Sequence, residues 1–329
     1  MTLSVCGKAG MAARKRQSNA RIITAQGIKS PHMIRAFPIA ALAAALACAA
    51  EDPPIPAETA SQMRKTLLDN IHAFWHPRSL DTKLGGYHLH FGPDGSPREN
   101  GAKGLVTQAR MLWYFARMAR AGFGDQAANL KAAEHGYRFL TEKMWDRRHG
   151  GFAWETDAAG LTPTKPKKHL YGQSFALYAL SEYAMASGRK DVLKFATQFF
   201  QLLEAKAHDK EFGGYVEFFH EDWTPAAEGS YMSAPGGYKL MNTHLHLMEA
   251  MTSFYRASKL PLARERLLEL MTIESNAVVR KGLTACTDQY RRDWTPVLEG
   301  AGARISYGHD LENIWLLADA AAAAGTPVA

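Results

Sequence analysis

One motif recurs along this chain at a nearly constant interval, and this spacing restricts the fold more than any other feature of the sequence. The motif is Gly-Gly-aromatic followed by alternating residues and a turn, as in GGYHLHFGPDG, GGFAWETDAAG and GGYVEFFHEDW. Its second glycines, Gly86, Gly151 and Gly214, lie 65 and 63 residues apart. A fourth copy, GLTACTDQYRRDWTP, starts at Gly282 and shares Asp-Trp-Thr-Pro with the third. Each copy predicts a short β-hairpin, because the alternation runs into Gly, Pro or Asp at a turn.

Segments with helical periodicity flank every hairpin. Two helices for each of four hairpins, with almost no other sheet, predict an all-α toroid or solenoid made of helix–hairpin–helix units. In such a ring the helices alternate between an inner and an outer layer, and we expect the helix after each hairpin to be the inner one. The predicted helices span residues 59–75, 103–121, 126–145, 169–187, 190–207, 239–257, 261–280 and 307–324.

The excess of basic residues is confined to the start of the chain. The sequence has 39 Lys and Arg against 32 Asp and Glu, and residues 1–50 contain seven of the basic residues and no acidic one. The rest of the chain is neutral overall, so we expect no nucleic-acid partner. Residues 33–50 are typical of an export signal, with an apolar stretch at residues 37–46 followed by small residues. That stretch is too short to span a membrane.

The sequence therefore predicts three segments. We interpret residues 1–32 as an extension read from an early start codon, residues 33–50 as a signal peptide, and residues 51–329 as the folded domain. A periplasmic or secreted protein is expected. Lipid attachment at Cys48 is less well supported, because the spacing of a lipobox is poor around it. Cys286 is the one cysteine left after residue 50, so we expect no internal disulfide and no Cys/His zinc site.

Polar side chains occur near the start of every helix that follows a hairpin, where leucine or methionine would pack better. In KLMNTHLHLMEA, Asn242, His246 and Glu249 are spaced i, i+4 and i+7 and share one stripe, whereas His244 points away from it. If these helices form the inner layer, their polar residues converge at one mouth of the ring. The other polar residues of this kind are Arg110, Tyr171, Gln173, His309 and Glu312.

Two of these helices carry the same His-x-x-Glu spacing, His246 with Glu249 and His309 with Glu312. A carboxylate at i+3 can hold an imidazole nitrogen, which fixes the tautomer and raises the basicity of the ring. The repetition on consecutive inner helices favours proton transfer in a polar pocket, without a cofactor, over histidines that merely bridge helices. A metal site of two His and two Glu is disfavoured, because the helical dimetal motif has the reverse order, Glu-x-x-His.

Five segments resemble the N-acylglucosamine 2-epimerase superfamily, nearest its branch of cellobiose 2-epimerases and mannose isomerases or epimerases. They are KGLVTQARMLWYFARMAR, KHLYGQSFALYALSEYAMASG, GGYVEFFHEDWTP, MNTHLHLMEAMTSFYRA and SYGHDLENIWLL, and the resemblance runs from about Phe74 to the last helix. It implies an (α/α)6 barrel that isomerises an aldose at C2 without a cofactor. One histidine removes the C2 proton, a cis-enediolate forms, and a second histidine returns the proton to C2 in an epimerase or to C1 in an isomerase.

The resemblance also implies a role for each polar residue. Arg110 would stabilise the developing oxyanion. His246, with Asn242, would bind the sugar and assist ring opening, and His309 would transfer a proton while Glu312 orients it. The sugar stays open between mannose, glucose, N-acetylglucosamine and a cellobiose-like disaccharide. The residues expected to line the pocket or contact the sugar are Tyr171, Gln173 and Glu249.

The family barrel has twelve helices, whereas eight are predicted here, a difference of about 80–110 residues. The family's second proton-transfer histidine belongs to the part of the family barrel for which no helices are predicted here. We therefore expect the chain as given to be a fragment, a frameshifted product, or a partner in an association, and to be weakly active or inactive. The remaining histidines, expected at the rim or in solvent, are His88, His90, His169 and His220.

Two other classes of function stay open. A glycoside hydrolase on the same barrel would need two pocket carboxylates on opposite sides of the scissile bond, and Glu249 and Glu312 are candidates. Each lies one turn from a histidine, which suits a supporting role better. A non-catalytic sugar-binding protein would bind saccharides without exchanging the C2 proton.

Overall fold

The computed structural model describes residues 55–98, 101–232 and 234–327. The chain divides into two compact units, residues 1–55 and 56–329, and the helices and strands described here belong to the second. The predicted extension and signal peptide lie outside the described residues. None of the helices in the described ranges is long and apolar enough to cross a lipid bilayer.

Eight helical segments occur in the described ranges, and each matches a predicted helix. Three of them change their hydrogen-bond pattern to a π-helical turn along their length, at η1, η2 and η3. The segments are α2 (Ala57–Thr66) continued by η1 (Leu67–His72) and α3 (Ala73–Trp75); α4 (Leu105–Arg120); α5 (Gln126–Phe139) continued by η2 (Leu140–Met144); α6 (Leu170–Ser187); α7 (Lys190–Lys206); α8 (Met241–Ser258); α9 (Pro261–Thr272) continued by η3 (Ile273–Ala277); and α10 (Tyr307–Ala324), which follows the short 3-10 helix η4 (Gly300–Ala303).

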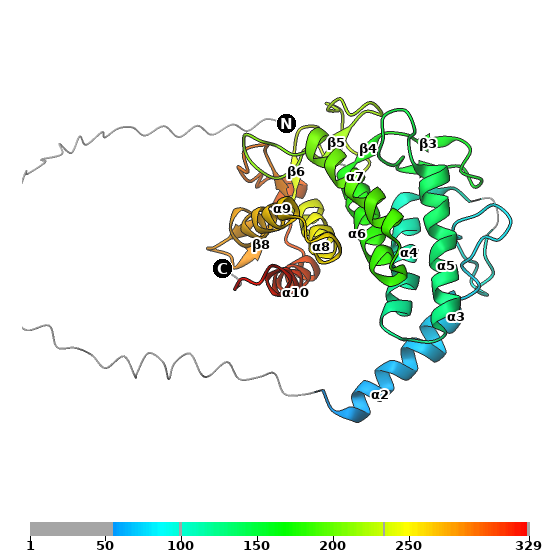
Figure 1. The fold of residues 1–329 in the computed structure, drawn as a ribbon. Coiled ribbons are helices and arrows are strands. Elements are labelled where there is room, and N and C mark those ends of the chain that lie inside the picture. The colour runs from blue at the N-terminus through cyan, green and yellow to red at the C-terminus, as the bar shows by residue number, and fades with distance from the viewer. Residues whose placement is uncertain (1–54, 99–100, 233, 328–329) are drawn as a thin grey trace, which may run out of the picture. The chain divides into compact units, whose positions relative to one another are not determined.

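The helices that follow the hairpins form the inner layer, as predicted. Helices α4, α6, α8 and α10 pack against one another in that order, and α5, α7 and α9 pack on them from the other side (Figure 1). The sequences explain the two layers. Helix α6 buries 13 of its 18 residues because it has neighbours nearly all round, whereas α7 buries only 5 of 17 along a single stripe.

Short strands join each repeat to the next. The two residues before α4, α6 and α8 form a strand that pairs, antiparallel, with the hairpin of the following repeat. The first N–H of these three helices donates to the carbonyls of Trp154, Glu217 and Asp288, respectively, at 2.8–2.9 Å. Each hairpin therefore lies over the N-terminus of the preceding inner helix, a pairing that the sequence did not predict. The strands are β1 (Lys103–Gly104) with β2 (Glu155–Thr156) and β3 (Pro163–Lys165), β4 (Lys168–His169) with β5 (Phe218–Phe219), β6 (Lys239–Leu240) with β9 (Gln289–Tyr290), and β7 (Val279–Arg280) with β8 (Ala285–Cys286).

The fourth residue of each inner helix fixes the hairpin that precedes it. The amide of Gln173 accepts from the N–H of Phe152 at 2.9 Å and donates to its carbonyl at 2.8 Å. His244 takes the same position in α8, where its Nε2 accepts from the N–H of Tyr215 at 2.9 Å. His244 thus points away from the stripe of its neighbours, as predicted, whereas Gln173 is fully buried and holds a hairpin instead of lining a pocket. The equivalent pairs are Gln108 with Tyr87 and Asp310 with Cys286.

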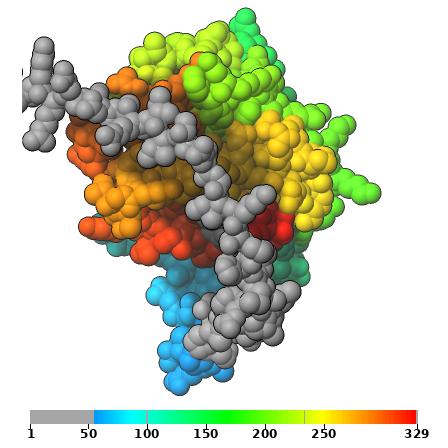
Figure 2. Space-filling view, turned by 90° about the vertical axis from the view of Figure 1, so that its left-hand side faces the viewer, coloured from blue at the N-terminus to red at the C-terminus, as the bar shows by residue number. Residues whose placement is uncertain are grey.

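The two ends of the helical series leave apolar side chains in solvent. Helix α2 has no buried residue, and Met63 on it is 61% exposed. Helix α10 contacts α8 and α9 with one side, and its other side is open. Both helices are visible on one face of the molecule, α2 in blue and α10 in red (Figure 2). The exposed apolar residues of α10 are Tyr307, Leu311, Ile314 and Trp315, which are 60–81% exposed.

Candidate active site

The four inner helices hold their side chains in a common register. The hairpin-fixing residue is the fourth residue in every case, so the sixth residue occupies an equivalent place in each helix. That sixth residue is Arg110 in α4, Phe175 in α6, His246 in α8 and Glu312 in α10. Three of these four residues are predicted site residues. Because the repeats share one register, residues from different repeats lie at one level of the inner layer.

Contacts join the first three of these side chains around Tyr171, the second residue of α6. The His246 ring lies 4.7 Å from Phe175 and 5.2 Å, edge to face, from Tyr171, measured between ring centroids. The Arg110 guanidinium lies 4.2 Å from the centre of the Phe175 ring, a cation–π contact. Arg110 itself is exposed, whereas His246 is only 4% exposed. The structure thus brings Arg110, Tyr171 and His246 together.

The charges of the two glutamates, Glu249 and Glu312, both act on Tyr171. Burial raises the pKa of Tyr171, and the negative charges of Glu249 and Glu312 act in the same direction. Arg110 opposes them through its charge and a hydrogen bond to the phenol. The convergence of α4, α6, α8 and α10 on one pocket stays a prediction.

Glu249 orients His246. Its Oε2 lies 3.0 Å from Nδ1 of the imidazole, the contact that the i, i+3 spacing predicts. The carboxylate also faces Tyr178, whose pKa is raised by burial and then by the charge of Glu249 and a hydrogen bond to it. With Nδ1 donating to Glu249, the other ring nitrogen keeps its lone pair and can accept a proton. Glu249 is thus engaged by His246, although the resemblance had suggested contact with the sugar.

The same spacing gives a different arrangement in α10. In the described part of the chain, no hydrogen bond joins the His309 side chain to Glu312, and the orientation of His309 by Glu312 stays a prediction. His309 lies instead near Asp288 of the fourth hairpin: burial raises the pKa of Asp288, and the His309 ring partly offsets this. Asp288 and His309 line a cavity of about 320 Å³ together with Met241 and Ser306. The hairpin supplies this carboxylate because it lies over the start of α8 and next to α10.

Asn242 is the second residue of α8, the position that Tyr171 holds in α6. Its backbone N–H donates to Oδ1 of Asp288 at 3.1 Å, which caps the first turn of α8. Its own side-chain Oδ1 is buried and has no hydrogen-bond partner among the described residues. Buried polar atoms are usually paired, so this oxygen is free to accept from a hydroxyl group of a ligand.

A second buried cluster, which the sequence did not predict, lies beside Tyr171. His169 was expected at the rim or in solvent, but it is fully buried because β5 of the third hairpin covers β4. Its Nδ1 accepts from the N–H of Tyr171 at 3.2 Å, and Oε1 of Glu217 lies 3.4 Å from the same nitrogen. Burial lowers the pKa of His169 to about 3 and raises that of Glu217 to about 8. The hydroxyl of Thr243 donates to Glu217, so this cluster joins the first turns of α6 and α8.

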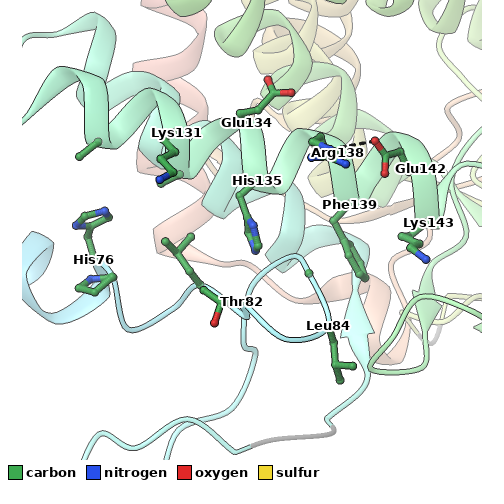
Figure 3. A pocket seen from close by; sticks show the side chains of 15 residues that line it. His76, Thr82, Leu84, Lys131, Glu134, His135, Arg138, Phe139, Glu142 and Lys143 are labelled. Atoms are coloured by element: carbon green, nitrogen blue, oxygen red, sulfur yellow. Dashed lines mark hydrogen bonds and ion pairs between the residues drawn. The ribbon is translucent and has the colours of Figure 1, made fainter.

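A cavity of about 760 Å³ lies away from these residues, on the outer side of the ring between α5 and the segment from His76 to Gly85 (Figure 3). It exists because the first repeat has small side chains where the second has large ones. Trp145 and Phe195 pack at 4.9 Å in the second repeat, and their equivalents in the first are Leu80 and Ala132. None of the predicted site residues lines this cavity, so its size does not locate the site.

One group of side chains in the described ranges has the spacing of metal ligands. Asp146, His149 and Glu221 present ligand atoms within 4.8 Å of one another at the second hairpin turn. Asp146 already forms an ion pair with the buried Lys168 at 2.8 Å. The group contains none of the predicted site residues.

The fold and the site together define a class: a toroid of helical hairpins with a polar, histidine-containing pocket at the start of its inner helices. Residues 85–327 match the family described as N-acylglucosamine 2-epimerase (GlcNAc 2-epimerase), and the chain belongs to that family. The structure is similar to that of the cellobiose 2-epimerase from Spirochaeta thermophila, with a TM-score of 0.74 and 36% identity over 84% of this chain and 68% of that one. The predicted (α/α)6 type of toroid is thereby confirmed.

The sequence is also similar to curated members of the family. It is 32% identical to cellobiose 2-epimerase from Dictyoglomus turgidum over 262 residues, 79% of this chain and 64% of the relative. It is 26% identical to D-mannose isomerase from Marinomonas mediterranea over 242 residues, 73% of this chain and 57% of the relative. The chain therefore spans less than two thirds of the length of these relatives. A β-1,3-1,4-glucanase from a Paenibacillus species, 12% identical with a TM-score of 0.54, shares the fold alone.

Proposed function

We propose that this protein is a carbohydrate 2-epimerase or aldose–ketose isomerase that moves a proton at C2 of a sugar by means of histidine. The observation that supports this most directly is His246, held at Nδ1 by Glu249 and packed between Tyr171 and Phe175 beside Arg110. A base held in one tautomer beside a cation is suited to proton transfer with a sugar, which begins with opening of the sugar ring.

Each side chain has a specific part in the proposed mechanism. The unprotonated nitrogen of His246 accepts the hydroxyl proton when the sugar ring opens, and Oδ1 of Asn242 accepts a hydrogen bond from the sugar. His309 then takes the proton from C2, and the negative charge that develops on the carbonyl oxygen is stabilised by Arg110. The planar enediolate can be reprotonated at C2 from the other face, which gives the epimer, or at C1, which gives the ketose.

Asp288 replaces Glu312 as the proposed carboxyl partner of His309. A carboxyl group whose pKa is raised by burial exchanges protons more readily near neutral pH than an exposed one. Glu312, at the level of His246, is left to act on Tyr171 and on the bound sugar. This division of roles follows from the register of the helices.

The relatives support the coarse part of the proposal. The similar curated proteins include cellobiose 2-epimerases and a D-mannose isomerase, and these names agree with an epimerase or isomerase that acts on sugars. The hydrolase alternative is weakened because Glu249, one of its two candidate carboxylates, is bonded to His246. Weak turnover, as expected from the sequence, is part of this proposal.

The test is exchange of the C2 proton in deuterated water, followed by proton NMR for mannose, glucose and cellobiose with the chain as printed. We expect slow exchange that His309→Asn abolishes and that Glu249→Gln reduces by about 10- to 100-fold, within the usual contribution of acid–base catalysis. Exchange that is unchanged in both variants would refute the assignment of roles. Hydrolysis of a glycoside that survives His309→Asn would favour the rival class.

We also propose a periplasmic or secreted location, which rests on the signal-like pattern of residues 33–50. Cell fractionation of the full chain with a C-terminal tag, together with mass determination of the processed N-terminus, tests it. A tagged protein that stays in the cytoplasm with its N-terminus intact would contradict the proposal.

A further inference from the structure

The cavity of about 760 Å³ on the outer side of the ring has the size of a small-molecule site. One of its walls is an edge of α5 and η2, and the opposite wall is the segment from His76 to Gly85 (Figure 3). None of the side chains around Tyr171 lines it. A ligand bound in this cavity therefore leaves the candidate active site open.

The second repeat shows what fits into the space of this cavity. There the indole of Trp145 and the ring of Phe195 pack edge to face, 4.9 Å between centroids, in the places that Leu80 and Ala132 hold in the first repeat. Leu80 and Trp145 each form the isolated β-bridge of their own hairpin, so the backbone is alike at this place. A backbone that holds two aromatic rings in one repeat leaves room for the ring of a ligand in the other.

The walls of the cavity suit a flat apolar ring. Phe139 is only 3% exposed and contributes to its apolar base. The His76 ring is stacked on His72, with 5.4 Å between the centroids and 2° between the planes. Nε2 of His135 donates to the carbonyl of Gly86 at 2.8 Å, which fixes this ring as well. Side chains that are already held lose little conformational entropy when a ligand packs on them.

Both carboxylates that line the cavity already have a cation as partner. Glu142 forms an ion pair with Arg138 at 3.1 Å, drawn as a dashed line in Figure 3. Glu134 forms an ion pair at 2.6 Å with Arg189, which precedes α7 and does not line the cavity. The acidic side chains are thus neutralised, and the charge that remains at the cavity is positive.

This positive charge belongs to two lysines at opposite ends of the cavity. Lys131 and Lys143 are exposed, and within the described ranges neither forms an ion pair. They are twelve residues apart, about 18 Å along the helix axis, so a small ligand contacts only one of them. Lys131 lies at the end where His76 lies (Figure 3) and directly precedes Ala132, where the second repeat has an aromatic ring. Lys131 is therefore the cation beside the empty ring position.

We propose that this cavity binds an aromatic carboxylate, with its ring in the space over Leu80 and Ala132 and its carboxylate on Lys131. The ring of the ligand fills the space that Trp145 and Phe195 fill in the second repeat, and the lysine selects an anion over a neutral compound. The binding site uses none of the residues of the proposed mechanism, so the proposal stands independently of the proposed function.

Isothermal titration of the chain as printed with naphthalene-2-carboxylate and with its neutral amide tests the proposal. We expect the carboxylate to bind about fivefold more tightly than the amide, which corresponds to one exposed charge pair, and Lys131→Ala to abolish this difference. Lys143→Ala, at the other end of the cavity, is the matched control and should change neither affinity. Leu80→Trp combined with Ala132→Phe gives the first repeat the side chains of the second. This double variant, the filled variant, should bind neither compound.

Several outcomes would overturn the proposal. They are the absence of binding, equal affinities for the two compounds, equal losses in the two lysine variants, and binding that the filled variant retains. Thermal unfolding shows whether the filled variant keeps its fold; if it does not, Ala132→Phe alone takes its place, and the exposed Lys131→Ala provides a test that leaves the core unchanged. Binding that Leu311→Lys removes and the filled variant retains would place the compound on α10 and would refute the proposal.

Discussion

Glu217 is a carboxyl group whose surroundings favour its protonated form. It is fully buried, it accepts from Thr243, and its neighbour His169 has its Nδ1 lone pair directed at the N–H of Tyr171. An ionised carboxylate facing that lone pair would add repulsion to the cost of burial. The pKa of Glu217 is raised from 4.5 to about 8, with burial as the main cause.

This shift predicts that Glu217 makes folding less favourable as the pH rises. Between pH 4.5 and about 8 the unfolded chain has released the proton while the folded chain keeps it, so stability falls through this window and levels off above it. Glu217→Gln mimics the protonated form and removes the effect, at about 1.4 kcal/mol per pKa unit. In urea unfolding from pH 5 to pH 9, the free energy of unfolding of the variant should increase relative to that of the wild type up to about pH 8. The exposed Glu228→Gln is the control, and a difference independent of pH would contradict the prediction.

Sequence reasoning succeeded at this scale for one of the two His-x-x-Glu pairs. The contact between His246 and Glu249 follows from i, i+3 spacing and was predicted. Glu217 and Asp288 were missed because their partners belong to neighbouring repeats. A signal was present: both residues occupy the same place in their hairpins, where their carbonyls accept from the first N–H of an inner helix.

At the scale of elements, the hairpins connect the helices. Each hairpin contacts an outer helix, the inner helix of its own repeat and the inner helix of the repeat before it. A buried lysine two residues before the start of each of the first three inner helices forms an ion pair with the aspartate that precedes the Gly-Gly turn. The lysine side chains are only 1–2% exposed. The pairs are Lys103 with Asp81 at 2.7 Å, Lys168 with Asp146 at 2.8 Å and Lys239 with Asp209 at 3.0 Å.

Removal of one such lysine should destabilise the fold strongly. Lys168→Ala leaves Asp146 largely buried without its cation, and loss of one partner of a buried pair typically costs about 3–5 kcal/mol. Lys131→Ala, on the exposed side of α5, is the matched control and should stay within about 0.5 kcal/mol. Chemical denaturation followed by circular dichroism measures both. Similar free energies of unfolding for the two variants would show that the pair does not stabilise the hairpin.

The elements themselves were largely predictable, and their pairing was not. Periodicity and capping located all eight helical segments of the described ranges, because each helix carries its own pattern of apolar residues. The hairpins were predicted from their turns as separate units. Their pairing with the strands before the inner helices involves only two residues a strand, as in Lys168–His169 with Phe218–Phe219, which is too short for any pattern to reveal.

At the scale of the whole helical unit, the ring explains why residues from four separate repeats lie at one level of the inner layer. The sixth residue of each inner helix recurs at the same level. The four repeats supply a cation, an aromatic ring, an imidazole and a carboxylate at this level, one from each helix. Only the resemblance to the family assigned the chemistry, because the repeat pattern alone fixes positions and not roles.

Among the described residues, no helix covers the side of α10 that faces away from α8 and α9. Leu311, Ile314 and Trp315 are 60–70% exposed on one stripe, and a contiguous apolar stripe in water favours association. We expect the chain to self-associate as its concentration rises, and Leu311→Lys combined with Ile314→Lys to suppress this without lowering the melting temperature, since neither side chain is buried. Leu161→Lys, at an isolated exposed leucine of the second hairpin, is the control. Sedimentation velocity over a concentration series decides the matter: if the wild type and the double variant share one concentration-independent sedimentation coefficient, the stripe does not drive association, and the apolar surface of α10 is tolerated in water.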